Sequence, residues 1–270
     1  ETSCGKVHDT WICGSCGFYG KGLVPEKCPI CSGQKFDVKT WPCDECLKSA
    51  KNETIKLIDM LLDDLGFSQK EVSVFFSGHR GYHVHVEKEA IRTLDVVARK
   101  EIVDYVCGLG LDMGFRGLYR KDSGKLGFPR APQPGESGWR GRVAKCMYDF
   151  ILKGKQEETW RRIVDFCTAS SSAKVDTVVT TDIHRLIRLT GALHGKTGLK
   201  KVEATISGIE AFDPFRSGVA FKKGALKVFV SDAPKFRLGD ETFGPYRSQK
   251  VELPTAPAVF LICRKRAEVT

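Results

Sequence analysis

The spacing of apolar side chains predicts one long helix and two short strands in the first third of the chain. Apolar residues recur at helical spacing between residues 47 and 65, at Ile55, Leu57, Ile58, Leu61, Leu62 and Leu65. Gly66 follows them, and glycine commonly ends a helix. The stretches EVSVFF (71–76) and YHVHVE (82–87) are short and either apolar or strictly alternating, which predicts two strands. The alternation of the second strand places its two histidines on one face.

Helical and extended patterns continue beyond these strands. Helical spacing predicts helices over residues 91–108, 142–153 and 157–167, and a loop rich in glycine and proline is predicted over residues 127–138. The last third of the chain contains the apolar runs VEATI, VAFKK, KVFV and LPTAPAVFLICR, which favour further strands. Together these patterns indicate an α/β (α+β) chain with a mainly helical part near residues 140–172.

Composition and charge narrow the class of protein. A chain of 270 residues with 41% hydrophobic content is long enough for one large or two modest cores. Its 43 Lys and Arg against 33 Asp and Glu give a net charge of +10, which favours polyanionic partners such as nucleic acid or nucleoside phosphates. No apolar run approaches the roughly 18 residues of a membrane span, and the start, ETSCGKVHD, resembles no signal or transit peptide. We therefore expect a soluble, intracellular protein with no membrane partner, and the missing initiator Met indicates a processed, trimmed or incomplete chain.

Seven of the eleven cysteines lie within the first 46 residues, in a pattern typical of metal sites. Two C-x-x-C pairs flank a glycine-rich stretch that reads as a hairpin, and their cysteines are Cys13, Cys16, Cys28 and Cys31. Four thiolates at this spacing close the tetrahedral site of a zinc ribbon. A disulfide framework is the alternative, but nothing in the sequence indicates secretion.

A second zinc site is predicted around the first. The remaining clustered ligands are Cys4, His8, Cys43 and Cys46, enough for a Cys₃His site with the ribbon inserted in its middle. Because both sites would be closed by protein ligands, we expect two structural zinc ions in a zinc-binding region over residues 1–47, followed by a domain over residues 48–270. The four other cysteines are expected to be small core residues: Cys107, Cys146, Cys167 and Cys263.

The stretch SGHRGYH, between the two predicted strands, has the chemistry of a phosphate site. It combines the side chains of Ser77, His79, Arg80 and His83 with two glycines that let a ligand approach the backbone. This combination suits a triphosphate better than a neutral molecule. The alternative for the strand histidines, His83 and His85, is that one of them is a satisfied structural side chain.

A second basic stretch follows at RLIRLTGALHGKTGL. Arg185 and Arg188 are spaced one helical turn apart, and His194 and Lys196 in the glycine-rich turn after them can both point at a phosphate. The spacing of a phosphate-binding P-loop is absent. A basic surface turn is therefore an equally good interpretation of LHGKTG on composition alone.

These motifs, in this order, resemble those of the small, catalytic subunit of archaeal and eukaryotic DNA primase. The resemblance rests on the Cys/His cluster before a long helix, on SGHRGYHVHV and RLIRLTGALHGKTGL, and on the GPY and VELP…AVFLI stretches near the end. It covers nearly the whole chain and implies a mixed-sheet catalytic core that contains the zinc-binding region. It also implies that the triphosphate is contacted by Ser77, His79, Arg80, His83, Arg188, His194 and Lys196. Asp176 resembles the third catalytic carboxylate of the family, while Lys196 could equally contact the template backbone.

The chain departs from the family pattern in one respect. The family uses an Asp-x-Asp pair on a strand before the zinc cluster, and no Asp-x-Asp occurs in this sequence. Asp37 does not replace it, because Lys39 stands where the second carboxylate belongs. A two-metal site needs several carboxylates, so we expect the chain alone to be inactive. Either a segment of roughly a hundred residues is missing, or another chain supplies it.

The resemblance implies DNA-directed primer synthesis from nucleoside triphosphates on a single-stranded DNA template. It further implies Mg²⁺ or Mn²⁺ as catalytic ions, a large primase subunit as heterodimer partner, and a location in the cytoplasm of an archaeal-type cell or in a eukaryotic nucleus. Two alternatives remain: a catalytically silent zinc-containing module that binds nucleic acid or nucleotides, and a nucleotide-binding regulatory protein. The missing aspartate pair is the feature that separates them from the enzyme.

Overall fold

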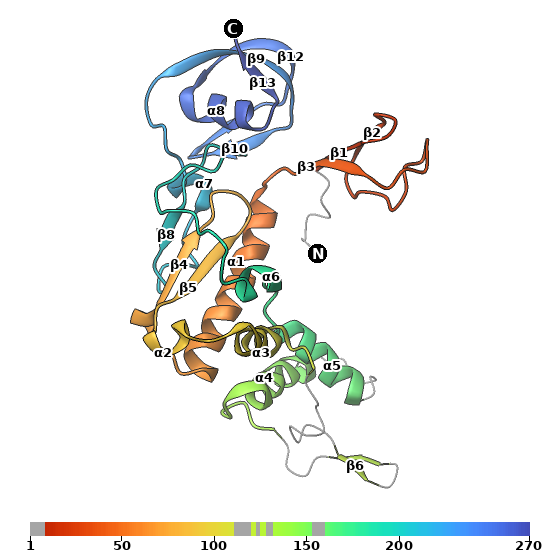
Figure 1. The fold of residues 1–270 in the computed structure, drawn as a ribbon, viewed down its shortest axis with the longest axis vertical. Coiled ribbons are helices and arrows are strands. Elements are labelled where there is room, and N and C mark those ends of the chain that lie inside the picture. The colour runs from red at the N-terminus through yellow and green to blue at the C-terminus, as the bar shows by residue number, and fades with distance from the viewer. Residues whose placement is uncertain (1–8, 111–119, 123–124, 128–131, 153–159) are drawn as a thin grey trace. The chain divides into compact units, whose positions relative to one another are not determined.

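The computed structural model describes residues 9–110, 120–122, 125–127, 132–152 and 160–270 (Figure 1). The chain divides into two compact units. The first comprises Glu1–Asn52, Val74–Val84 and Ile187–Thr270, and the second comprises Glu53–Ser73 and His85–Leu186. Within the described ranges, none of the helices combines the length and apolarity that a bilayer crossing requires.

The first unit begins with a small antiparallel sheet. Its strands are β1 (Thr10–Cys13), β2 (Tyr19–Lys21) and β3 (Phe36–Lys39), in the order β2-β1-β3. Trp11 on the central strand is buried and packs edge-on against Phe36 at 5.3 Å between ring centroids. The sheet is too small for a large core, and Trp11 also packs against Phe18 at 5.9 Å between ring centroids.

The predicted helix and strands after this sheet are confirmed. Helix α1 (Asp44–Asp59) continues into a π-helical turn (Met60–Asp64), and Gly66 follows with a positive φ of 68°. Strands β4 (Val72–Phe76) and β5 (Tyr82–Val86) belong to a sheet of order β5-β4-β8, in which β8 (Val202–Ala204) pairs antiparallel with β4.

The last part of the first unit is strand-rich, as predicted, but with a helix at an unexpected place. An antiparallel sheet of order β12-β9-β13 contains β9 (Ala225–Ala233), β12 (Tyr246–Pro254) and β13 (Ala267–Val269). The shorter elements are α7 (Pro214–Ser217), β10 (Phe236–Leu238) and β11 (Glu241–Phe243).

Two of the four predicted extended runs in this part are wrong. The run AVFLIC lies in helix α8 (Thr255–Cys263), and VAFKK forms no regular element. Helix α8 is apolar all round and has buried residues along its length, so its sequence lacks the period that separates a helix from a buried strand.

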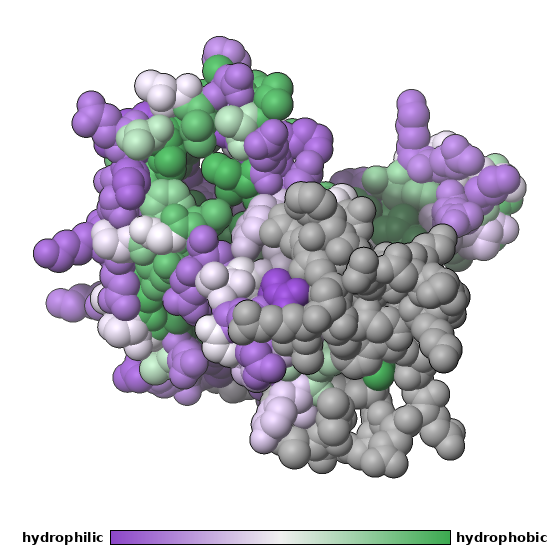
Figure 2. All heavy atoms as spheres, turned by 90° about the horizontal axis from the view of Figure 1, so that it is seen from below, coloured by the Kyte–Doolittle hydropathy of each residue, from purple (hydrophilic) through white to green (hydrophobic). Residues whose placement is uncertain are grey.

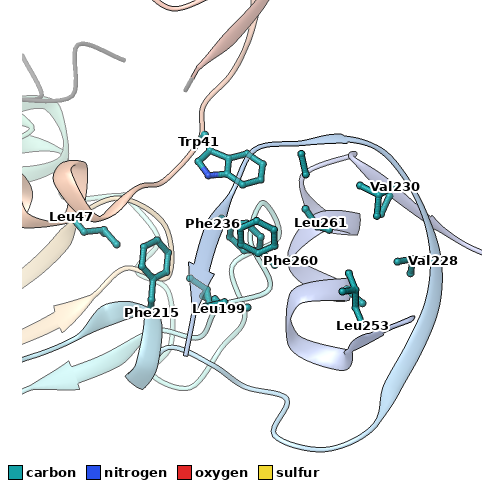
Figure 3. Packing of buried hydrophobic residues seen from close by; sticks show 14 of the residues in the cluster. Trp41, Leu47, Leu199, Phe215, Val228, Val230, Phe236, Leu253, Phe260 and Leu261 are labelled. Carbon is teal, nitrogen blue, oxygen red and sulfur yellow. The ribbon is translucent and has the colours of Figure 1, made fainter. Parts of the chain in front are cut away.

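The core of the first unit is built on aromatic rings. Trp41, from the linker before α1, packs edge-on against Phe236 and Phe260, whose own rings stack at 5.3 Å (Figure 3). Phe76 at the end of β4 and Leu261 on α8 are fully buried in the same cluster. The core therefore joins segments from both ends of the chain.

The second unit is mainly helical, as predicted. Its elements are a 3₁₀ turn (Gln69–Glu71), α2 (Glu89–Arg92), α3 (Val96–Cys107), the hairpin β6 (Arg120–Asp122) and β7 (Lys125–Gly127), α4 (Gly138–Leu152), α5 (Trp160–Ser171) and α6 (Thr177–Thr181). Trp139 on α4 is buried, and its indole N–H donates to the Tyr105 carbonyl at 3.1 Å. Val164 and Cys167 on α5 are fully buried in the same core.

The helix predicted over residues 91–108 is confirmed over α3, but the structure breaks its N-terminal end off as α2. Asp95 has an extended backbone and its carboxylate accepts the Ala98 N–H at 2.8 Å, which makes it the N-cap of α3. The apolar spacing continues through the break, so periodicity alone did not reveal the cap.

Exposed apolar side chains gather in one stretch of sequence. Figure 2 shows mainly hydrophilic residues on one face, with apolar residues between them. Seven exposed apolar residues lie between positions 178 and 193: Val178, Val179, Ile183, Leu186, Ile187, Leu189 and Leu193. Leu186 is 96% exposed. These side chains contribute to neither core.

Candidate functional site

The first predicted metal site is present in the structure. The sulfur atoms of Cys13, Cys16, Cys28 and Cys31 all lie within 4.8 Å of one another, and we call these four residues the cysteine cluster. Two of the separations are 3.5 Å (Cys13–Cys31) and 3.6 Å (Cys16–Cys28). Sulfurs bound at about 2.3 Å to one zinc ion would lie about 3.8 Å apart, whereas a disulfide bond measures about 2.0 Å. The cluster therefore fits a zinc ion and not a pair of disulfides.

The two halves of the cysteine cluster share one backbone turn. In each half the residue four positions after the first cysteine donates its N–H to the carbonyl of that cysteine: Gly17 to Cys13 and Ser32 to Cys28, both at 2.9 Å. Both donors have a positive φ, 75° at Gly17 and 56° at Ser32. The repeated turn aims each pair of sulfurs at a common point, as a zinc knuckle does.

The pKa values of two cysteines in the cluster are shifted in opposite directions. Hydrogen bonds from the backbone of Cys16 and Ser15 lower the pKa of Cys13 to about 6. The pKa of Cys16 is raised to about 12, because the sulfur of Cys31 and burial outweigh a hydrogen bond from the Phe18 backbone. Crowded thiols cannot all ionise together unless a cation joins them, so metal binding would release protons.

The second predicted zinc site stays a prediction. Cys4 and His8 lie outside the described residues. Cys43 directly precedes α1 and Cys46 lies in its first turn, where the N–H of Cys46 lies 3.4 Å from the sulfur of Cys43. This contact keeps the two sulfur-bearing residues on one side of the helix start, which is compatible with a shared ligand.

The stretch SGHRGYH forms a tight turn between β4 and β5. The N–H of Ser77 donates to the Gly81 carbonyl at 2.9 Å, and the Ser77 hydroxyl accepts the N–H groups of His79 and Gly81 at 3.3 Å. Gly78 has a φ of 83°, and a β-carbon there would lie 2.9 Å from the Leu199 carbonyl oxygen. Only glycine allows the second basic stretch to come this close.

The stretch LHGKTGL forms a second turn that is bonded to the first. The N–H of His194 donates to the Leu199 carbonyl at 2.7 Å, which closes the turn. The buried hydroxyl of Thr197 donates to the Gly78 carbonyl at 2.5 Å, and the Arg188 guanidinium donates to the Ser77 carbonyl at 3.0 Å. We call residues 77–81 and 193–200 together the two-turn site, and all of it lies in the first unit.

Two histidines, one from each turn, stack in the two-turn site. The rings of His79 and His194 are 4.8 Å apart and 10° from parallel. Burial, reinforced by neighbouring cations, lowers the pKa of His79 to about 3 and that of His194 to about 4. Both rings are therefore neutral at pH 7. Because Nδ1 of His194 accepts the Lys196 N–H at 3.1 Å, its proton lies on Nε2, where it can be donated to a ligand.

Positive charge is in excess at the two-turn site. The cationic side chains there are Arg80, Arg188, Lys196 and Arg264. Among the described residues, these four side chains form one ion pair, between Arg80 and Asp9 at 3.4 Å. Asp9 is 3% exposed and also accepts the Trp41 N–H at 2.7 Å. A site with several cations, two neutral imidazoles and one carboxylate is suited to a polyanion.

The structure places the other predicted site residues elsewhere. His83 lies half-buried on β5. Asp176 belongs to the second unit, where it is exposed and caps α6 by accepting the Val179 N–H at 3.2 Å. The prediction that Arg185 and Arg188 lie one helical turn apart is wrong, because α6 ends at Thr181 and the chain after it is irregular.

Two residues of the site were not predicted. Asp9 lies immediately before β1, and Arg264 lies at the C-terminal end of α8. The basic run RKR in LICRKRAEV was the available signal for Arg264, but its contacts lie 68 and 185 residues away in sequence. No spacing rule reaches that far.

Comparison with known proteins supports the family resemblance that the sequence motifs indicate. Residues 36–206 match the family model described as DNA primase small subunit. A "DNA primase small subunit PriS" from Nitrosopumilus maritimus is 30% identical over 99% of this chain and 72% of its own length. The proteins of that name from Cenarchaeum symbiosum and Methanothrix thermoacetophila are 31% and 32% identical over 97% and 83% of this chain, and over 70% and 71% of their own lengths.

Proposed function

The chain belongs to the DNA primase small subunit family, and on this premise we propose that its two-turn site binds the triphosphate of an incoming nucleotide. The proposal rests on one observation: two turns that are distant in sequence are bonded to each other. Together they present more cationic side chains than carboxylates. A triphosphate supplies the missing negative charge and many acceptor oxygens.

The residues at the site would divide the work of binding. Arg80 and Arg188 offer planar guanidinium donors, and Lys196 offers a mobile point charge. His194 would donate from Nε2 without adding charge, because its pKa is about 4. Such preorganised donors stabilise the charge that develops on phosphates during nucleotidyl transfer.

We further propose that this site serves primer synthesis on a single-stranded DNA template, in a heterodimer with a large primase subunit. The wider functional role is what family membership implies for a small subunit. The zinc region would have a structural role, with two zinc ions when the Cys4, His8, Cys43 and Cys46 site is included. An archaeal-type cytoplasm suits the relatives, which are archaeal.

The described residues do not assemble a divalent-cation site for catalysis. Within them, the cysteine cluster is the group in which three or more metal-ligating side chains lie close together. Asp176 stands as a single exposed carboxylate with one oxygen engaged in capping. We propose that a two-metal site draws on carboxylates beyond those of the described residues, since the sequence also contains no Asp-x-Asp.

A binding experiment tests the nucleotide site. We expect Arg80→Gln and His194→Ala each to weaken binding of a nucleoside triphosphate by about tenfold or more, because charge-assisted hydrogen bonds contribute about 1.5–3 kcal/mol. Titration calorimetry measures the affinity, and Arg247→Gln, an exposed arginine on β12, is the control. Unchanged affinity in both test variants would refute the site.

The control for folding follows from Asp9. Since Arg80→Gln leaves a buried carboxylate without its cation, the double variant Asp9→Asn/Arg80→Gln should recover stability but not affinity. Urea unfolding of the single and double variants separates the two effects.

The lone carboxylate also favours a second candidate function, a nucleotide-binding protein without catalysis. We expect no primer synthesis by the 270-residue chain on single-stranded DNA with Mg²⁺ or Mn²⁺. Synthesis should appear when the part of a primase small subunit that carries Asp-x-Asp is added as a separate polypeptide.

Asp176→Asn should then abolish synthesis with little loss of stability, because asparagine is as good an N-cap. Asp182→Asn is the matched control, since Asp182 accepts the His184 N–H at 3.0 Å. Synthesis by the unsupplemented chain would overturn this assignment of carboxylates.

A further inference from the structure

A fourth cationic side chain reaches the two-turn site from the C-terminal helix. Arg264 follows the last residue of α8, and its guanidinium NH1 lies 3.5 Å from Nε2 of His79 and 3.4 Å from the Lys196 carbonyl oxygen. Its central carbon lies 5.6 Å from the centroid of the Trp41 ring. One side chain thus touches both turns and the aromatic core, all within the first unit.

Among the residues that the structure describes, none is a direct counterion of Arg264. Within the described ranges it takes part in no ion pair, and its buried Nε has no hydrogen-bond partner. The next arginine along the chain differs, because Arg266 has Asp232 at 3.8 Å and the Thr10 hydroxyl at 3.1 Å. Burying an unpaired guanidinium is unfavourable, so this arrangement lacks the compensation that structural arginines normally have.

The surroundings of Arg264 add to this imbalance. Burial, together with repulsion from Arg266 and Arg80 and opposed by attraction to Asp9, lowers its pKa to about 10. The guanidinium therefore remains charged at pH 7. The neighbouring ring of His79 has a lowered pKa for the same reasons, burial and nearby cations. Each group would be stabilised by one added anion.

The contact with His79 also fixes a tautomer. An arginine can only donate, so Nε2 of the neutral His79 must accept from it, and the His79 proton lies on Nδ1. Arg264 therefore holds one imidazole in orientation while its remaining N–H groups stay available to a ligand. The face of Trp41 supports the guanidinium without using any of its donors.

We propose that Arg264 is a further phosphate ligand of the two-turn site, donating from its unused N–H groups to the phosphate chain of the bound nucleotide. The proposal rests on the proposed function of that site. It means that the C-terminal end of α8 contributes to nucleotide binding as well as to the core.

A role in structure alone makes a different prediction. If Arg264 only supported Trp41 and the Lys196 carbonyl, replacing it would change stability and leave phosphate affinity unaltered. The measured quantity must therefore be affinity for a phosphate probe, with stability followed separately.

The test is binding of inorganic triphosphate and of a nucleoside triphosphate to the full 270-residue chain. We expect Arg264→Gln to weaken both about tenfold to a hundredfold and to reduce the salt dependence of binding, because one ionic contact is lost. Arg264→Lys should lose less, about threefold to tenfold, since it keeps the charge but not the planar fork. Arg247→Gln, exposed on β12, should bind both probes like the unaltered chain.

The outcomes distinguish the role of Arg264 from the proposed nucleotide binding by the two-turn site. Wild-type affinity in Arg264→Gln, together with weakened binding in Arg80→Gln, would overturn the role of Arg264 and leave the nucleotide site standing. No binding of either probe by the unaltered chain would overturn both. If Arg264→Gln loses its fold by circular dichroism, Arg264→Lys decides: unchanged affinity in that variant contradicts the proposal.

Discussion

The cysteine cluster and the two-turn site are each assembled from two short motifs. The distance along the sequence between the two motifs differs greatly. The cysteine cluster joins residues 12 and 18 positions apart, whereas the two-turn site joins residues more than 100 positions apart. The first is closed by one small sheet, while the second depends on β4 and on the core beneath α8. Local spacing can thus specify a metal site completely, but it can specify only parts of an anion site.

The two regions also differ in what completes them. Four crowded thiols are completed by a cation, and a group of cations with neutral histidines is completed by an anion. Asp9 lies next to both, because it precedes β1 and pairs with Arg80. Asp9 thus connects the strand that carries Cys13 to Arg80 of the two-turn site.

Removing the metal should have the largest effect, and it should be local. Cys28→Ser is expected to lower the zinc content by one ion and to abolish amide protection in β1, β2 and β3, since zinc binding to such sites contributes about 10–16 kcal/mol to folding. Amide protection in residues 193–200 should persist. Elemental analysis and hydrogen exchange measure the two results.

The same measurement settles the second zinc site. We expect two zinc ions per unaltered chain and one in Cys43→Ser. A single ion in the unaltered chain would show that the Cys4, His8, Cys43 and Cys46 site is not formed. Equal loss of protection in both regions after Cys28→Ser would contradict the comparison itself.

A glycine pair tests how tightly the two turns are joined. Gly78 and Gly191 both have a φ of 83°, but a β-carbon at Gly191 would meet nothing within 4 Å, whereas one at Gly78 would lie 2.9 Å from a carbonyl oxygen. Gly191→Ala should therefore cost about 1–2 kcal/mol from backbone strain alone. Gly78→Ala should cost more in urea unfolding and should also weaken triphosphate binding. Equal costs would mean that the close approach is unimportant.

The histidine stack predicts a pH dependence of stability. The pKa values of His79 and His194 are about 3 and 4 in the folded chain, below the usual value near 6.5, so the unfolded chain binds more protons between these limits. Stability should therefore fall as the pH is lowered from about 6.5 toward 4. In the variant His79→Gln/His194→Gln the fall should be smaller. Urea unfolding at several pH values measures it, and an unchanged slope would contradict the burial of the two rings.

The sequence was sufficient for elements with a clear period or a clear end. The helix that begins near residue 47 and the strands at 71–76 and 82–87 were predicted to within a few residues. Helix α8 was not, because it is apolar on every face and leaves no polar stripe to define a period. Likewise, the break at Asp95 depends on a single side-chain cap.

The site shows the same limit. Cysteine spacing predicted the cysteine cluster, and the two glycine-rich stretches predicted both turns. Asp9 and Arg264 were missed, because their positions depend on how the first and last segments pack around Trp41. Residues that complete a site from distant parts of a core have no local signature.

The most direct test of the account is whether the two turns bind one anion together. The ring signals of His79 and His194, assigned by NMR with the His79→Gln and His194→Gln variants, should be followed while inorganic triphosphate is added. The account predicts that both rings shift with the same dissociation constant, because the anion lies between Arg80 of one turn and Lys196 of the other. Shifts in one ring only, or two different dissociation constants, would show that the turns do not form a single site.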